Sequence, residues 1–69
     1  MPYDYSKLNG RIIEMCGTQA IFAQKMNLSE RSVSLKLNGK VGWKQAEIAT
    51  ACDILNITIA EIPSYFFKL

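Results

Sequence analysis

Residues 18–40 have the sequence TQAIFAQKMNLSERSVSLKLNGK, which contains two short helical patterns separated by a few polar and apolar residues. Thr18 and Ser29 stand where helix N-caps are expected, because their side-chain oxygens can accept a hydrogen bond from the first turn. Asn27 lies between the two patterns and tolerates the left-handed backbone that a tight exit requires. The segment therefore predicts one helix from Thr18 to near Asn27 and another from Ser29 to Asn38-Gly39.

The apolar residues of this segment fit two helices that cross closely. Ala23 is small at the expected crossing, where a larger side chain would push the helices apart. Leu28 precedes the Ser29 cap and Val33 follows it by four residues, which is the spacing of a hydrophobic staple. These features predict a helix-turn-helix, in which the second helix is held out from the body and can enter a DNA major groove.

The remaining sequence predicts three more helices, over 5–16, over 44–55 and from about 59 onward. Gly17 ends the first as a C-terminal cap, and Thr58 with Glu61 forms a capping box for the last. Pro63 is tolerated only in a first turn, so the last helix ends there or bends. We expect an all-α, five-helix domain spanning residues 1–69, with a core of Leu8, Ile12, Phe22, Ala23, Met26, Leu28, Val33, Leu37, Ile48, Cys52, Leu55 and Ile62.

Composition narrows the class of protein. The chain has 69 residues, a length that suits one domain. Of these residues 49% are hydrophobic and 20% charged, a composition too apolar for a disordered polymer. It contains no apolar run of the ~18 residues that a membrane span needs. The N-terminal Met-Pro-Tyr-Asp-Tyr lacks the basic start and apolar stretch of a signal peptide, so we expect a cytoplasmic location.

The chain contains no histidine, which removes the commonest general base and the commonest transition-metal ligand. Cys16 and Cys52 alone cannot complete a four-ligand zinc site. We interpret them as buried free thiols, with a disulfide as the alternative. No base–nucleophile pair or phosphate-binding loop is present, so we expect no enzymatic activity, metal, cofactor or small-molecule substrate.

Charge is distributed unevenly along the chain. Residues 18–44 hold five basic residues against Glu30, a net charge of +4, whereas the rest carries −2, and the two sum to the formal +2 of the whole chain. A basic segment in a mildly acidic body suits a surface that binds a polyanion, and an ordinary solvated face is the alternative. The basic residues of the segment are Lys25, Arg31, Lys36, Lys40 and Lys44.

The segment resembles the helix-turn-helix of the phage Cro and repressor family. The matching residues are Gln19, Ala23, Ser29, Val33 and Asn38-Gly39. Asn27 replaces the usual glycine, and Lys36 occupies a place where the family often has an apolar residue, so Leu37 is expected to assume its core role. The five-helix layout over residues 5–67 and the Tyr-Phe-Phe end most resemble small Cro-like regulators, of the modulator-of-repression type, from temperate phages of Gram-positive bacteria.

The resemblance implies a lambda-repressor-like domain whose recognition helix, residues 29–37, reads bases in the major groove of a palindromic operator. Base-facing positions carried over from the family are Ser29, Glu30, Arg31, Ser34 and Leu35, and phosphate-facing ones are Gln19, Lys36, Lys40 and Lys44. Arg31 can pair bidentately with guanine, Glu30 can accept from cytosine, and Leu35 can meet a thymine methyl group. Packing against the fourth helix or the tail is the alternative for Leu35.

The C-terminal tail is strongly apolar, with Tyr65, Phe66, Phe67 and Leu69 within five positions. We expect some of these residues to cover the core and any exposed ones to form a dimer or partner interface. Regulators with this motif usually bind palindromic sites as dimers, with half-sites ~34 Å apart.

Two functions follow from the resemblance. The first is a sequence-specific repressor of a phage genetic switch that binds its operator on the nucleoid of the bacterial host. The second is an antirepressor, or modulator, that binds the partner phage repressor and masks its DNA-reading helix. The small net charge and the presence of Glu30 and Leu35 on the recognition helix keep the second function open.

Overall fold

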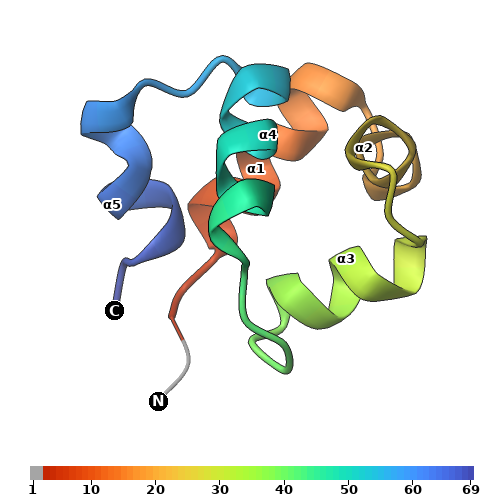
Figure 1. Ribbon diagram of the computed structural model, residues 1–69, viewed down its shortest axis with the longest axis horizontal. Helices are drawn as coiled ribbons and strands as arrows, with labels where there is room; N and C mark the ends of the chain where they lie inside the picture. Colours follow the sequence, from red (N-terminus) through yellow and green to blue (C-terminus); the bar gives the residue numbers. More distant parts are fainter. Residues whose placement is uncertain (1–2) are drawn as a thin grey trace.

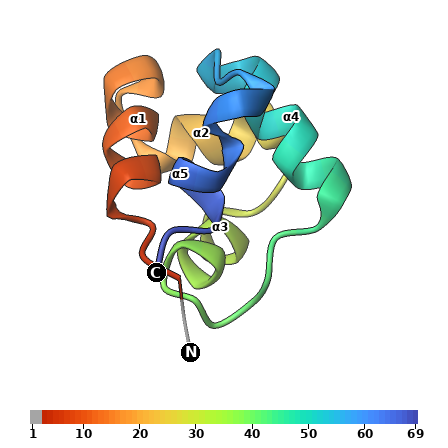
Figure 2. The same cartoon turned by 90° about the vertical axis from the view of Figure 1, so that its left-hand side faces the viewer.

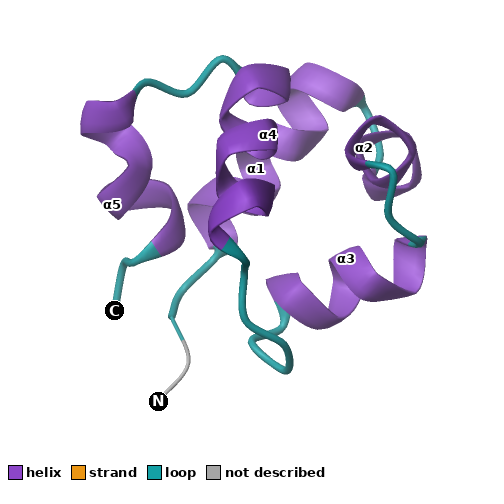
Figure 3. Cartoon of the chain, viewed as in Figure 1, coloured by secondary structure: helices purple, strands orange, loops and turns teal. Residues whose placement is uncertain are grey.

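The computed structural model describes residues 3–69 as an all-helical domain (Figures 1 and 3), and no strand occurs in that range. Its elements are α1 (Ser6–Cys16), α2 (Gln19–Met26), α3 (Glu30–Leu37), α4 (Gln45–Leu55), a short 3-10 turn η1 (Ile59–Glu61) and α5 (Ile62–Phe66). The predicted all-α architecture of five helices is confirmed, with boundaries within one residue of expectation for the first four.

Local side-chain and backbone features set the ends of α2 and α3. The Thr18 side chain accepts a hydrogen bond from the Ile21 amide at 3.1 Å, and Ser29 accepts one from the Ser32 amide at 3.1 Å. Asn27 adopts a left-handed conformation with φ of 60° and ends α2. The turn therefore sits where the sequence predicted it, because its determinants lie within the turn itself.

Helix α4 and the 3-10 turn η1 each have in their first turn a glutamate that caps a backbone amide. The backbone amide of Lys44 donates to Glu47 Oε1 at 2.9 Å, and that of Thr58 donates to Glu61 Oε1 at 3.0 Å. Pro63 lies in the first turn of α5, where its missing N–H is harmless. The last helical segment thus does not end at Pro63. It changes from the 3-10 turn η1 to the α-helix α5 just before this proline and continues to Phe66.

The helices surround a single core. α2 and α5 lie on opposite sides of α1 and α4, and α3 extends along the base of the molecule against α2 (Figures 1 and 2). Seven of the predicted core residues are buried, and the other five are half-buried against them. The buried apolar residues also include Tyr5, Ala51 and Ile57, which were not predicted, and Tyr65 and Phe66 of the tail.

The two ends of the described chain meet beside the core. The backbone amide of Asp4 donates a hydrogen bond to the carbonyl oxygen of Lys68 at 2.6 Å. The rings of Tyr3 and Phe67 meet edge to face with centroids 5.6 Å apart. Figure 1 shows the two ends of the described chain, residues 3 and 69, on the same side of the domain.

Among residues 3–69, no helix has the length and apolar character needed to cross a membrane.

Candidate interaction face of α3

The residues predicted to read DNA lie together on one side of α3. Ser29, Glu30 and Arg31 are exposed, and Ser34 and Leu35 are half-exposed. Val33, which points away from Arg31 and Leu35, is fully buried against the core. We call these five outward residues (Ser29, Glu30, Arg31, Ser34, Leu35) the α3 face. All five are at least partly accessible to a partner, as their predicted role requires.

The loop of residues 38–44 folds back onto the end of α3 and extends this face. The amides of Lys40 and Val41 both donate to the Leu35 carbonyl, at 2.9 Å and 3.4 Å. Lys40, Val41 and Lys44 are all exposed. The loop therefore places two lysines and one valine beside the α3 face, and Lys40 and Lys44 are accessible as the sequence predicted.

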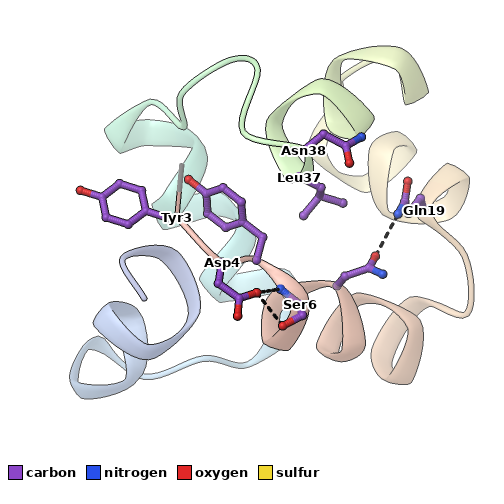
Figure 4. Close-up of a pocket in the computed structure, with 8 residues that line it drawn as sticks. Tyr3, Asp4, Ser6, Gln19, Leu37 and Asn38 are labelled. Carbon is purple, nitrogen blue, oxygen red and sulfur yellow. Dashed lines mark hydrogen bonds between the residues drawn. The ribbon is translucent and has the colours of Figure 1, made fainter. Parts of the chain in front are cut away.

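Gln19 lies at the start of α2, and its side chain is held within the protein. Its Nε2 atom donates to Oδ1 of Asn9 at 2.9 Å (Figure 4). It is half-buried at the edge of a surface pocket of about 410 Å³, which is shared with Tyr3, Asp4, Tyr5, Ser6, Asn9, Leu37 and Asn38. One amide proton is thus engaged by α1, which limits Gln19 as a phosphate ligand.

Lys36 lies in the interior instead of on the predicted phosphate-binding surface. It is only 4% exposed, and its Nζ atom is 2.9 Å from Glu47 Oε1. Nζ also donates to the Gly42 carbonyl at 3.1 Å and lies 5.9 Å from the centre of the Trp43 ring. The prediction of a phosphate contact at Lys36 is wrong, because the ammonium group already has protein partners and is shielded from solvent.

The aliphatic stem of Lys36 occupies the interior place for which Leu37 was expected to substitute. Leu37 is only half-buried and lines the pocket beside Gln19 instead. A long lysine side chain can bury its methylene groups while its charged end reaches a partner. The rotation of α3 therefore follows the usual helix-turn-helix arrangement even though an apolar residue is missing at that position.

Glu47 has two hydrogen-bond donors on the same carboxylate. Burial of Glu47 acts to raise the pKa of its carboxyl group, but the Lys44 amide and the Lys36 ammonium favour the ionised form. The net result is a pKa below the usual range for glutamate. The role of Glu47 as the partner of Lys36 was not predicted from the sequence.

The pairing of Lys36 with Glu47 changes the charge that α3 presents to solvent. Of the three charged residues in α3, only Glu30 and Arg31 are exposed, and they carry opposite charges. The exposed basic residues of the 18–44 segment are then Lys25, Arg31, Lys40 and Lys44. The outward side of α3 itself is therefore electrically balanced, and the positive charge lies in the flanking segments.

The C-terminal tail divides into buried and exposed residues. Tyr65 is 8% exposed and Phe66 1% exposed, and the Phe66 ring packs edge to face on Trp43 with centroids 5.4 Å apart. Tyr65 and Phe66 are therefore the tail residues that cover the core, and their candidate role in a dimer or partner interface is excluded because both side chains are buried in their own chain. Phe67 and Leu69 remain exposed.

A second pocket, of about 290 Å³, opens between the 38–44 loop and the tail. It is apolar and largely aromatic. Its walls are formed by Tyr3, Tyr5, Gly39, Val41, Gly42, Trp43, Phe66 and Phe67. Val41, which the sequence did not single out, contributes both to this pocket and to the surface beside the α3 face.

Cys16 and Cys52 are free and half-buried, so the interpretation as free thiols holds and the disulfide alternative does not. Burial, with a smaller contribution from the negative charge of Asp53, raises the pKa of the Cys52 thiol. A raised pKa keeps this thiol protonated and weakly nucleophilic.

The fold and the exposed α3 face define a small all-α protein with a helix-turn-helix. Residues 1–69 match the model of a family described as "Protein of unknown function (DUF739)", and the chain belongs to this family. No curated protein matches the sequence.

The structure is similar to the solution structure of the modulator of repression (MOR) of the temperate bacteriophage TP901-1 from Lactococcus lactis. The two share 58% sequence identity with a TM-score of 0.84, over 97% of this chain and 90% of the other. The predicted resemblance to modulator-of-repression proteins of temperate phages is thereby confirmed, and the chain is a homologue of a phage genetic-switch regulator.

Proposed function

We propose that this chain is a non-enzymatic modulator of repression, which acts by binding the repressor protein of its phage through the α3 face and the adjoining loop. The similarity to MOR over nearly the whole chain supports a role in the control of repression. The observation that carries the choice of a protein partner is the absence of net positive charge on the outward side of α3, where Glu30 and Arg31 balance each other.

A recognition helix that enters a major groove lies between two rows of phosphates, and positive charge drives that association. Here the one additional cation on α3, Lys36, is enclosed and paired with Glu47 at 2.9 Å. Glu30, exposed in the first turn, would repel the phosphates. A protein partner can match both charges, with a basic group opposite Glu30 and an acidic group opposite Arg31.

Apolar side chains at the same surface also favour a protein partner. Leu35 is half-exposed on the α3 face, and Val41 is 45% exposed in the loop next to it. Protein interfaces typically bury apolar residues at their centre and keep charged groups at the rim. The α3 face and the adjoining 38–44 loop together have this composition. Leu35 and Val41 are candidates for the centre, and Arg31, Lys40 and Lys44 for the rim.

Operator DNA is the second candidate partner. It is favoured by the exposed lysines that follow α3, namely Lys40 and Lys44, and by the position of α3 at the edge of the domain. On this alternative the lysines would contact phosphates, and Arg31 would contact a base edge.

Substitution of Glu30 separates the two candidates, because Glu30→Lys changes their affinities in opposite directions. Binding of the purified protein to the phage repressor and to switch-region DNA would be measured by calorimetry and fluorescence anisotropy at several salt concentrations. We expect repressor binding by the wild type, a loss of at least tenfold for Glu30→Lys, and near-unchanged binding for the surface control Lys25→Ala.

Tight wild-type binding to operator DNA without the repressor, with a steep fall in affinity as salt increases, would overturn the proposal. In that case Glu30→Lys would strengthen binding to DNA of any sequence. Arg31→Ala would also cost about 1–3 kcal/mol at a single base position.

A further inference from the structure

We propose that Lys36 and Glu47 are positioning residues, which hold the 38–44 loop against α3 in the arrangement that binds the partner. The inference rests on the proposed function, since it concerns how the α3 face is assembled. Neither side chain contributes directly to the binding surface, because Lys36 is buried and Glu47 is half-buried beneath the loop.

Three separate segments meet at the Lys36 ammonium group. Lys36 itself comes from the last turn of α3, the Gly42 carbonyl at 3.1 Å belongs to the loop, and Glu47 Oε1 at 2.9 Å belongs to the first turn of α4. The same Glu47 oxygen accepts the Lys44 amide at 2.9 Å. One carboxylate and one ammonium group therefore connect the end of α3, the middle of the loop and the start of α4.

The other hydrogen bonds from the loop to α3 come from its first four residues, beginning with the Asn38 amide, which donates to the Ser34 carbonyl at 3.0 Å. The Lys40 and Val41 amides bond to the single carbonyl of Leu35, and the Gly39 amide bonds to the Lys36 carbonyl at 3.2 Å. These bonds fix the first half of the loop, whereas the Lys36–Gly42 contact fixes the second half. The exposed Val41 lies between these two attachments, and Lys44 follows them, so the pair controls where both side chains stand.

Stability alone does not account for a buried ion pair at this position. Replacing such a pair with apolar residues of similar size is often neutral or stabilising, because the charges lose their hydration. A methionine at position 36 could fill the same volume as the lysine stem but could not bond to Gly42 or Glu47. The lysine therefore contributes the fixed geometry of the loop. Replacing the ion pair should then weaken partner binding while changing the stability of the fold only slightly.

The test compares the wild type with Lys36→Met and with the double variant Lys36→Met/Glu47→Gln. Glutamine at position 47 can still accept the Lys44 amide, so the α4 cap is kept and no buried charge loses its partner. Lys25→Met is the matched control, because it removes the same charge from an exposed site. Each protein would be measured for thermal unfolding, for amide hydrogen exchange in the free state, and for repressor affinity.

We expect the double variant to unfold within a few degrees of the wild type. Its Lys40 and Val41 amides should exchange at least tenfold faster, and its repressor affinity should fall at least tenfold. The Leu28 amide lies in the turn before α3, at the end of the helix far from the loop, and bonds to the Ala23 carbonyl at 2.9 Å. It should exchange at the wild-type rate. Lys25→Met should match the wild type in all three measurements.

Unchanged exchange at Lys40 and Val41 in the double variant would overturn the inference, as would repressor affinity within threefold of the wild type. Failure of the proposed function has a different signature, because the wild type itself would then not bind the repressor. In that case hydrogen exchange in the free protein still decides whether the pair holds the loop. If Lys36→Met alone fails to fold, the double variant still provides the comparison, because it leaves no buried charge without a partner.

Discussion

Arg11 of α1 donates a hydrogen bond from Nε to the Leu55 carbonyl oxygen at 2.9 Å, and its Nη2 atom reaches the Asn56 carbonyl at 3.5 Å. An arginine from one helix thus supplies donors to the unpaired carbonyl end of another, where the helix dipole also favours a cation. The contact joins α1 to the end of α4 and leaves the α3 face untouched.

Arg11→Met should therefore lower the free energy of unfolding by about 1.5–3 kcal/mol, the usual contribution of a hydrogen bond from a charged group. Methionine keeps much of the aliphatic packing but removes the donors. Urea unfolding followed by circular dichroism would measure the change, with the exposed Lys25→Met as a control. A loss equal to that of the control would show that the α4 carbonyls are satisfied by water.

The two neighbouring phenylalanines of the tail should differ sharply in their contribution to stability. Phe66→Ala removes a buried ring that packs on Trp43 and should cost about 3–5 kcal/mol. Phe67→Ala removes a ring that is 47% exposed, so it should cost under ~1 kcal/mol. Equal losses in chemical denaturation would contradict the division of the tail into a core part and a surface part.

Asn27 should be replaceable by glycine but not by alanine. Its φ of 60° lies in the left-handed region, which costs most residues about 1–2 kcal/mol and glycine very little. We expect Asn27→Ala to be less stable than the wild type by about 1 kcal/mol, and Asn27→Gly to be no less stable. A thermal unfolding series with all three proteins measures this, and an Asn27→Ala protein as stable as Asn27→Gly would refute the assignment.

Acid should weaken the connection between α3 and α4. Because the folded-state pKa of Glu47 lies below its unfolded value of about 4.3, its stabilisation is fully present above that pH. The stabilisation disappears as the pH falls through the lower, folded-state pKa. The difference in unfolding free energy between the wild type and Glu47→Gln should thus shrink from pH 6 to pH 3, and a constant difference would exclude this role for the carboxylate.

Features determined by neighbouring residues were predictable from the sequence. The Thr18 and Ser29 caps and the Asn27 turn each depend on residues within one helical turn, so their positions followed directly. The outward placement of part of α3 was predictable for the same reason, since helical spacing alone sets Arg31 and Leu35, each two residues from Val33, on the side away from it.

Features that depend on distant partners were not predictable. Lys36 belongs to the interior because of Glu47, eleven residues further on in another helix, and neither residue alone reveals the other. The sequence held one signal for this pair, namely a lysine at a position where the family often has an apolar residue. The carboxylate that could neutralise it, Glu47, lies early in the next helix. In the same way, the run from Tyr65 to Leu69 is apolar except for Lys68, so only the packing against Trp43 shows which rings are enclosed.

The hydrogen bond between Asp4 and Lys68 places the first and last described segments side by side. A short flexible linker can therefore join them, and the chain can be reopened elsewhere as a circular permutant. A cut between α4 and η1 would leave α1 to α4 contiguous and attach α5 ahead of α1. The order in which the helices are synthesised could then be changed while their arrangement in space is kept.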